Sequence, residues 1–220
     1  MSGFFHIFRA FRIIIIFSRK GLLSKVSKSS LVPQRALFFI NILNFFVGKE
    51  VPDSEIGSAI VETLKILGPA FVKLGQALAT RPDIIGVQLS NELAQLHDNM
   101  EPFSYEKIVK SIKTETGKDI GQLFKSFNKT PIAAASISQV HKAKTFENDT
   151  VAVKILRPGV EKAIFSDLRF FKWCAKFLSS LDQEISFLRL PEAVDIFEVL
   201  TKNEMDLRLE AAAADELSLI

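Results

Sequence analysis

The sequence T-V-A-V-K-I-L at residues 150–156 decides the fold of this 220-residue chain. Its β-branched and apolar side chains predict a buried strand, with Lys154 in its interior. A second β-rich run precedes it at residues 140–146, and the E-N-D sequence at 147–149 has the composition of a hairpin turn. A Pro-Gly pair at residues 158–159 ends the second run. These features predict an antiparallel hairpin that carries a lysine.

A lysine within an apolar strand is costly to bury unless a partner neutralises its charge. Protein kinases place such a lysine on the strand that follows a hairpin, where it holds the α- and β-phosphates of ATP. A V-x-V-K sequence also occurs in ordinary edge strands, with the lysine in water. The residues around Lys154 therefore decide between the two interpretations.

An alanine-rich stretch, P-I-A-A-A-S-I-S-Q-V-H at residues 131–141, lies one hairpin upstream of Lys154. It stands where a kinase has its glycine-rich phosphate loop, yet it contains no glycine. Alanine disfavours positive φ, so such a turn has fewer backbone states. Its amide N–H groups and serine hydroxyls can still bind a phosphate. The alternative is the start of an alanine-rich helix. The nucleotide-binding candidates in this stretch are Ala133, Ala134, Ala135 and Ser136.

An acidic stretch, N-E-M-D-L-R-L-E at residues 203–210, supplies a partner for Lys154. We expect Glu210 to form an ion pair with Lys154, as the glutamate of helix αC does in kinases. The two residues are 56 positions apart, so helices must be inserted between strand and αC. Helical periodicity continues from Pro191 to the last residue, which would place Asp206 and Glu210 on one helix face. The alternative is a solvated acidic face.

A K-L-G-Q sequence at residues 73–76 is the third candidate element. Lys73 and Gln76 are three residues apart and share a helix face. Gly75 lowers helix stability by ~1 kcal/mol relative to alanine, which indicates the close approach of another backbone. The alternative is a surface lysine beside a packing glycine.

The chain up to about residue 130 is expected to be helical. Proline, glycine and capping residues predict helices at residues 54–81 (one helix, or two separated at Gly68-Pro69), 86–98, 104–117 and 119–127, and helix returns at 160–181.

Residues 1–49 form a basic, phenylalanine-rich leader. They contain eight Lys or Arg residues, nine Phe and no Asp or Glu, against 20 basic and 25 acidic residues in the remainder. Helices are expected at 1–20 and 34–47, the first with Phe4, Phe8 and Phe11 on one face. One interpretation is an element that lies on an anionic membrane surface. The other is a pair of helices packed on the body, or a poorly ordered leader.

The composition excludes a disordered protein and a protein stabilised by an intramolecular disulfide. Hydrophobic residues make up 48% of the chain, which is too many for a disordered protein. Cys174 is the only cysteine, so an intramolecular disulfide is impossible, and its apolar neighbours favour a packed thiol over a nucleophile.

The elements described so far resemble, jointly and in this order, the UbiB family of atypical kinases, also called the ADCK family. The resemblance covers roughly residues 50–220. It rests on the K-x-G-Q at 73–76, the A-T-R-P-D that follows it, the alanine-rich loop at 133–139, the V-A-V-K that ends at Lys154, and the E-x-D at Glu204 and Asp206. Ser138 departs from the glycine or alanine that is usual in the family.

The resemblance implies an α+β fold: a helical N-terminal extension and a protein-kinase-like N-lobe, with a small antiparallel sheet, inserted helices and an αC-like helix. The expected divisions are the leader at 1–49, the helical extension at 50–130 and the partial N-lobe at 131–220. It also implies binding of ATP with magnesium, ATPase activity rather than ordinary protein phosphorylation, and a role in ubiquinone biosynthesis at a membrane. The residues expected to cover the site are Lys73, Gly75, Gln76, Glu204 and Asp206.

The largest departure from the family is the absence of a catalytic-loop Asp with its downstream Asn and of a D-F-G-type aspartate. The C-lobe is therefore expected to be missing, and the chain to be truncated, with no metal ligands of its own and weak or absent ATP binding. A second interpretation is a non-catalytic, membrane-associated module, a pseudokinase fragment.

The expected partners are an anionic membrane surface and, by resemblance, ubiquinone-biosynthesis enzymes or lipid-like quinone precursors, but no nucleic acid. The expected location is peripheral, on the cytoplasmic side of the inner membrane, or alternatively mitochondrial.

Overall fold

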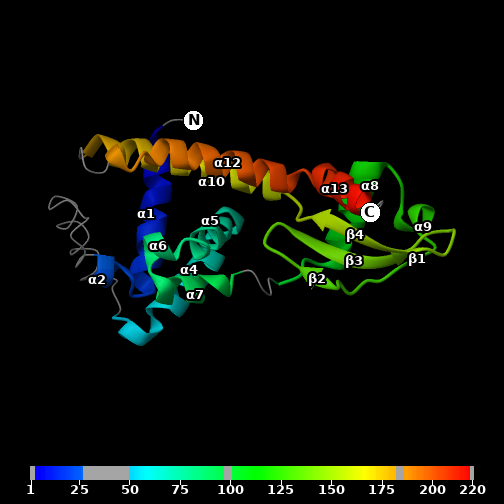
Figure 1. Cartoon of the computed structure of the whole chain (residues 1–220), viewed down its shortest axis with the longest axis horizontal. Helices are drawn as coiled ribbons and strands as arrows, with labels where there is room; N and C mark the ends of the chain where they lie inside the picture. The colour runs from blue at the N-terminus through cyan, green and yellow to red at the C-terminus, as the bar shows by residue number, and fades with distance from the viewer. Residues whose placement is uncertain (1–2, 27–49, 97–100, 182–185, 219–220) are drawn as a thin grey trace.

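The computed structural model describes residues 3–26, 50–96, 101–181 and 186–218. A group of helices lies at one end of the molecule and a small sheet at the other, and two long helices lie along the helical end and reach the near end of the sheet (Figure 1). The helix expected at residues 34–47 lies outside the described residues. The fold class is α+β, as the sequence predicts.

The helical end begins with α1 and continues through a compact group of helices. Gly68, with φ of 115°, separates α4 from α5, so the two-helix alternative is confirmed. Proline at the first position of α5 fits this break because its missing N–H is not needed there. The elements are α1 (Gly3–Arg19), α2 (Leu23–Val26), η1 (Asp53–Glu55), α4 (Ile56–Leu67), α5 (Pro69–Ala79), α6 (Pro82–Ile85) and α7 (Val87–Ala94).

The predicted hairpin forms the centre of the sheet. Strands β3 (Ser138–Lys144) and β4 (Thr150–Leu156) pair antiparallel with Val140 opposite Lys154. Asn148 takes the positive φ of 73° that their turn requires. The other edge of β3 pairs with two short strands, β1 (Ser126–Phe127) and β2 (Ala133–Ala134).

The helix expected at residues 119–127 is only partly present. Helices α8 (Tyr105–Thr116) and α9 (Ile120–Leu123) precede the sheet, but Phe124 is extended. The chain then enters β1, where Ser126 pairs with Lys144 of β3. The prediction was wrong here because the backbone groups of β1 find partners on a strand distant in sequence.

Two long helices join the ends of the molecule. Helices α10 (Val160–Leu181) and α12 (Leu190–Met205) lie side by side and antiparallel (Figure 1). The Nζ of Lys172 lies 2.7 Å from Asp195 and 2.5 Å from Glu198 across this contact. The prediction that helical structure continues without a break after Pro191 is wrong. Asp206 leaves helical geometry, with φ of −84° and ψ of 86°, and a separate helix, α13 (Leu207–Ser218), follows.

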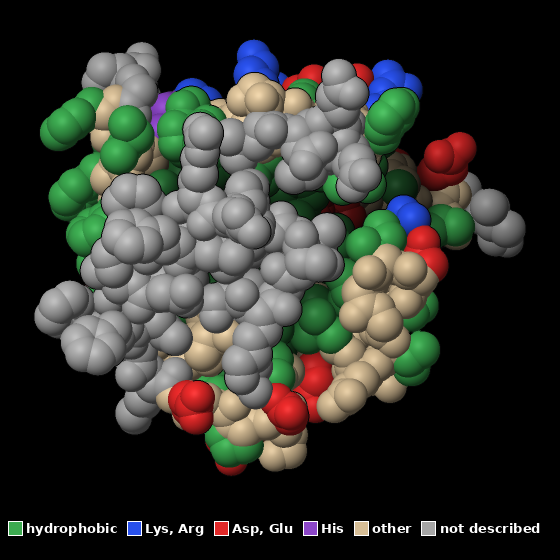
Figure 2. Space-filling model, turned by 90° about the vertical axis from the view of Figure 1, so that its left-hand side faces the viewer, with side chains coloured by type: hydrophobic (Ala, Val, Ile, Leu, Met, Phe, Trp, Pro, Cys, Tyr) green, Lys and Arg blue, Asp and Glu red, His purple; other side chains and the backbone are tan. Residues whose placement is uncertain are grey.

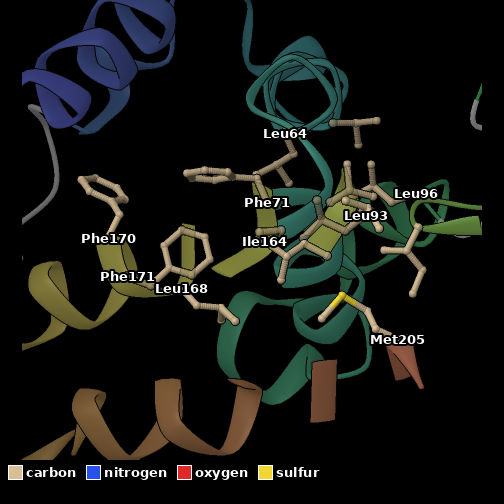
Figure 3. Packing of buried hydrophobic residues seen from close by; sticks show 14 residues of the cluster. Leu64, Phe71, Leu93, Leu96, Ile164, Leu168, Phe170, Phe171 and Met205 are labelled. Carbon is tan, nitrogen blue, oxygen red and sulfur yellow. The ribbon is translucent and has the colours of Figure 1, made fainter. Parts of the chain in front are cut away.

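The buried side chains form two clusters. The larger lies among α4, α5, α7, α10 and α12 (Figure 3), and Ile137 from the β2–β3 turn belongs to it. The smaller joins α8 to one face of the sheet through Phe103, Ile108, Ile112 and Ile155. A residue of the sheet's turn is thus part of the helical core.

Helix α1 has one docked face and one exposed face. Arg9 forms an ion pair with the buried Asp167 of α10 and donates a hydrogen bond to Ser166 (3.2 Å). His6 stacks on Trp173 with ring centroids 5.7 Å apart. The exposed face carries Phe4, Phe5, Ile7, Phe8 and Phe11. Hydrophobic side chains gather at the surface of this end of the molecule (Figure 2). None of the described helices is long and apolar enough to cross a membrane.

Gly75 permits the tight packing of α5. A Cβ at this position would collide with Leu96 and lie 2.7 Å from the Cδ1 of Leu64. The close neighbours are therefore leucine side chains, and the expectation that a backbone approaches Gly75 is wrong.

We predict that Gly75→Ala lowers the free energy of unfolding by about 2 kcal/mol, because the added methyl group overpacks a filled core. Urea denaturation followed by circular dichroism measures the change. Gly121→Ala on α9 is the matched control, since a Cβ there meets nothing within 4 Å. Equal effects of the two substitutions would contradict the assigned role of Gly75.

Candidate functional site

A cavity of about 490 Å³ lies where α5, α12, β4 and the β2–β3 turn meet. Four segments that are far apart in the sequence line it together. Its lining residues are Lys73, Gln76, Ala77, Ala135, Ser136, Ile137, Ser138, Lys154, Phe197, Leu200, Thr201 and Glu204. The K-x-G-Q helix, the alanine-rich turn, the V-A-V-K lysine and the E-x-D glutamate thus meet in one place.

Lys154 forms the predicted ion pair with Glu210. Its Nζ donates to Glu210 Oε1 at 2.8 Å and to Oε2 at 2.5 Å. This part of the sequence interpretation is confirmed. The pair is less buried than expected, since the side chains of Lys154 and Glu210 are 33% and 58% exposed. Lys154 is therefore held by a carboxylate but remains open to a ligand.

A second ion pair joins Lys73 to Glu204 and links α5 to α12. The Lys73 side chain is only 13% exposed, so this pair is the more buried of the two. Gln76 binds elsewhere, donating from Nε2 to the carbonyl of Leu96 at 2.8 Å. The K-x-G-Q sequence therefore contributes a charged side chain to the cavity and a hydrogen bond that connects α5 to the segment just after α7.

Asp206 does not join Glu204 at the cavity. It stands at the C-terminal end of α12, where its carboxylate accepts from the backbone N–H of Arg208 (3.2 Å) and lies 2.6 Å from the Nη2 of Arg208. These hydrogen bonds from Arg208 lower the pKa of Asp206. The two acids of the E-x-D sequence thus have different roles, one in the cavity and one at a helix break.

The alanine-rich stretch forms a tight turn between strands, so the alternative of a helix start is wrong. Ala133 and Ala134 form β2 and are not among the cavity residues. The turn closes with the N–H of Ala135 donating to the carbonyl of Ser138 at 2.8 Å. Ser136 and Ile137 at its tip are both 2% exposed. Within the part of the chain that the structure describes, no acceptor is found for the N–H groups of these two residues.

The cavity has the chemistry of a phosphate site. Two lysine ammonium groups meet there with a turn whose Ser136 and Ile137 amides have no acceptor among the described residues, and both kinds of group bind phosphoryl oxygens. Each lysine is already paired with one glutamate, which fixes its position. The residues therefore fit an anionic ligand of the size of a nucleotide's phosphates.

The described residues contain no cluster of three metal-binding side chains and no thiol that is ionised at neutral pH. No group of three or more His, Cys, Asp or Glu side chains that could hold a metal is found among them. Burial raises the pKa of Cys174 to about 11, so its thiol stays protonated at neutral pH.

Two residues near the cavity were not singled out from the sequence. Thr201, 2% exposed, lines the cavity from α12 one turn before Glu204. Its i,i+3 spacing from Glu204 was the available signal. Arg157 follows β4 and lines a second cavity of about 720 Å³ between β4, α8 and α13. Nothing in its neighbourhood in the sequence indicated a partner.

Comparison with known proteins identifies related sequences. Residues 95–219 match the ABC1 atypical kinase-like domain. A protein of Pseudomonas paraeruginosa named "Probable protein kinase UbiB" is 38% identical over 161 residues, which are 73% of this chain and 30% of the relative. A protein of the same name from Aeromonas salmonicida is 33% identical over 214 residues, 95% of this chain and 38% of the relative. A third, from Shewanella sp. (strain MR-4), is 40% identical over 162 residues. The chain thus spans 30% to 38% of the length of these relatives.

We predict that Glu204→Gln destabilises the protein more than Glu210→Gln. Removing Glu204 leaves a largely buried lysine without a partner, which costs on the order of 3 kcal/mol. Removing Glu210 breaks a pair that water already screens, which costs less than about 1 kcal/mol. Urea denaturation at neutral pH measures both changes. Equal losses would show that the exposures of the two lysines do not govern the strength of the pairs.

Proposed function

The chain belongs to the family of ABC1 atypical kinase-like proteins, and from this premise we propose that it forms the phosphate-binding part of an ATP site. The observation that carries the proposal is the cavity where Lys73, Lys154 and the 135–138 turn meet. The complete protein would be a UbiB-like atypical kinase or ATPase that supports ubiquinone biosynthesis.

Lys154 would bind the α- and β-phosphates, as the corresponding lysine does in kinases. Glu210 keeps its ammonium group in place through two hydrogen bonds. The N–H groups of Ser136 and Ser138 in the turn would point at the phosphoryl oxygens. Lys73 and Glu204 would close the other side of the cavity, where a substrate would otherwise reach the phosphates.

Magnesium accompanies ATP in reactions of this kind and neutralises charge that develops on the phosphates. The described residues offer no carboxylate cluster for it. We therefore propose no magnesium ligand from this chain. The catalytic-loop and magnesium-binding aspartates of a kinase are also absent from its sequence.

A second candidate function, a non-catalytic module on an anionic membrane, is favoured by the exposed face of α1. Phe4 and Phe8 are 80% and 68% exposed, while the opposite face of the helix is docked on α10. Arg12 and Arg19 are also exposed on this helix and would attract anionic headgroups. Lipid-like quinone precursors or ubiquinone-biosynthesis enzymes would be its partners. We propose a peripheral location on the cytoplasmic side of the inner membrane, or alternatively a mitochondrial one.

We predict weak binding of magnesium-ATP by the 220-residue chain, with a dissociation constant on the order of 1 mM. Lys154→Met should abolish the binding, because it removes the charge that meets the phosphates. Lys162→Met, which lines only the larger cavity, is the matched control and should bind as the wild type does. Isothermal titration calorimetry measures the affinities.

The same samples test catalysis. We expect no substantial ATP hydrolysis, because the chain lacks the groups that hold metal and orient the nucleophile. Clear turnover that disappears in Lys154→Met would show that the catalytic residues lie elsewhere in this chain.

We predict that the chain floats with vesicles that contain anionic lipid, and that added salt weakens the association. Phe8→Ser combined with Phe11→Ser should reduce flotation, since inserted aromatic side chains are lost. Phe146→Ser, which removes an exposed phenylalanine from the β3–β4 turn, is the control. Unchanged flotation of residues 51–220 would rule out a role for the leader.

A further inference from the structure

Arg157 contacts the alanine-rich turn through both its backbone and its side chain. Its N–H donates to the carbonyl of Ile137 at 2.7 Å. Its Nη2 donates to the carbonyl of Ala135 at 3.3 Å and to the carbonyl of Glu101 at 3.0 Å. The guanidinium carbon lies 5.3 Å from the ring centre of Phe103. One residue thus binds two of the turn's four carbonyl groups.

Phe103, whose ring lies beneath the guanidinium group of Arg157, is itself held in place by hydrogen bonds. Phe103 is 7% exposed, and its N–H donates to Oε1 of Gln139 at 2.9 Å. Nε2 of Gln139 donates in return to the carbonyl of Phe103 at 3.3 Å. Gln139 lies on β3, directly after the turn. The 101–103 segment, Arg157 and the turn are therefore tied into one unit.

Arg157 replaces a bond that a tight turn normally makes for itself. In a closed four-residue turn, the first carbonyl accepts from the fourth N–H. Among the described hydrogen bonds, the Ala135 carbonyl accepts from Arg157 and not from Ser138. An alanine-rich turn without positive φ gains its shape from this external donor.

The bonds of Arg157 also decide where the amides of the turn point. In a planar trans peptide, the C=O and the following N–H point in opposite directions. With the carbonyls of Ala135 and Ile137 directed at Arg157, the N–H groups of Ser136 and Ser138 point away from it. Arg157 lines the larger cavity and not the smaller one, while Ser136 and Ser138 line the smaller one with both lysines.

We propose that Arg157 is the positioning residue of the phosphate-binding turn, holding its amide groups toward an anion that Arg157 itself does not touch. The inference rests on the proposed function, because it assigns the turn a phosphoryl ligand. A lysine could not replace it fully, since a lysine keeps the charge but lacks the planar guanidinium group that lies over the Phe103 ring while Nη2 donates to the two carbonyls.

The test compares wild type, Arg157→Met, Arg157→Lys and the control Lys162→Met by amide hydrogen exchange, read by NMR on the 220-residue chain. Arg157→Met should speed exchange of the Ala135 amide about tenfold, because a hydrogen bond from a charged group is lost at the turn. Arg157→Lys should give an intermediate rate. The amide of Ile112 in α8 should not change in any variant, which shows that the fold is kept. Unchanged exchange at Ala135 in Arg157→Met would overturn the proposal.

Titration with magnesium-ADP separates this inference from the proposed function. If the wild type binds and Arg157→Met binds about tenfold more weakly, with Arg157→Lys between them, the proposal is supported. Equal affinity of wild type and Arg157→Met would overturn it. If the wild type does not bind, the proposed function fails, and the exchange rates alone decide whether Arg157 positions the turn.

Discussion

The side chain of Ile137 joins the sheet to the helical body, and the shape of the cavity depends on this contact. It lies in the core formed by α4, α5, α7, α10 and α12, while its carbonyl is bonded to the end of β4. The glycines of a glycine-rich phosphate loop allow more backbone conformations than the alanines of this turn do. Withdrawing Ile137 would expose a buried side chain at a cost of about 2 kcal/mol. The turn therefore presents its amides in a preformed arrangement.

The cavity combines this fixed turn with charges that are already balanced. Lys73 and Lys154 each have a glutamate partner, so an entering polyanion competes with carboxylates for the same ammonium groups. The affinity for the anion is then the difference between two sets of charge interactions. Lys154 is the more exposed of the two, so weakening its ion pair with Glu210 costs less free energy than weakening the ion pair of Lys73 with Glu204. The two lysines are thus unequal sites although both line the same cavity.

The sequence predicted the hairpin from strand composition. It predicted the pairing of Lys154 with Glu210 from the cost of an isolated buried charge and from the analogy with the αC glutamate of kinases. The break at Asp206 was missed because the residues around it keep helical periodicity, and a side-chain bond to the backbone N–H of Arg208 competes with the helix. The strand β1 has two residues, too few to show alternation. The neighbours of Gly75 and the partners of Arg157 are set by tertiary packing, and Arg157 binds backbone carbonyls, which no residue type in the sequence marks.

The ion pair between Arg9 and Asp167 has a mechanical consequence. It joins α1 to a 22-residue helix, about 33 Å long, that starts just after the strand carrying Lys154. The ion pairs of Lys172 hold that helix against α12, so the two helices form a rigid unit to which α1 is attached. If the exposed face of α1 lies on a lipid surface, the contact between Arg9 and Asp167 would fix the position of the cavity relative to that surface. A membrane-bound ligand would then have to extend from the headgroups to the cavity in order to reach Lys73 and Lys154.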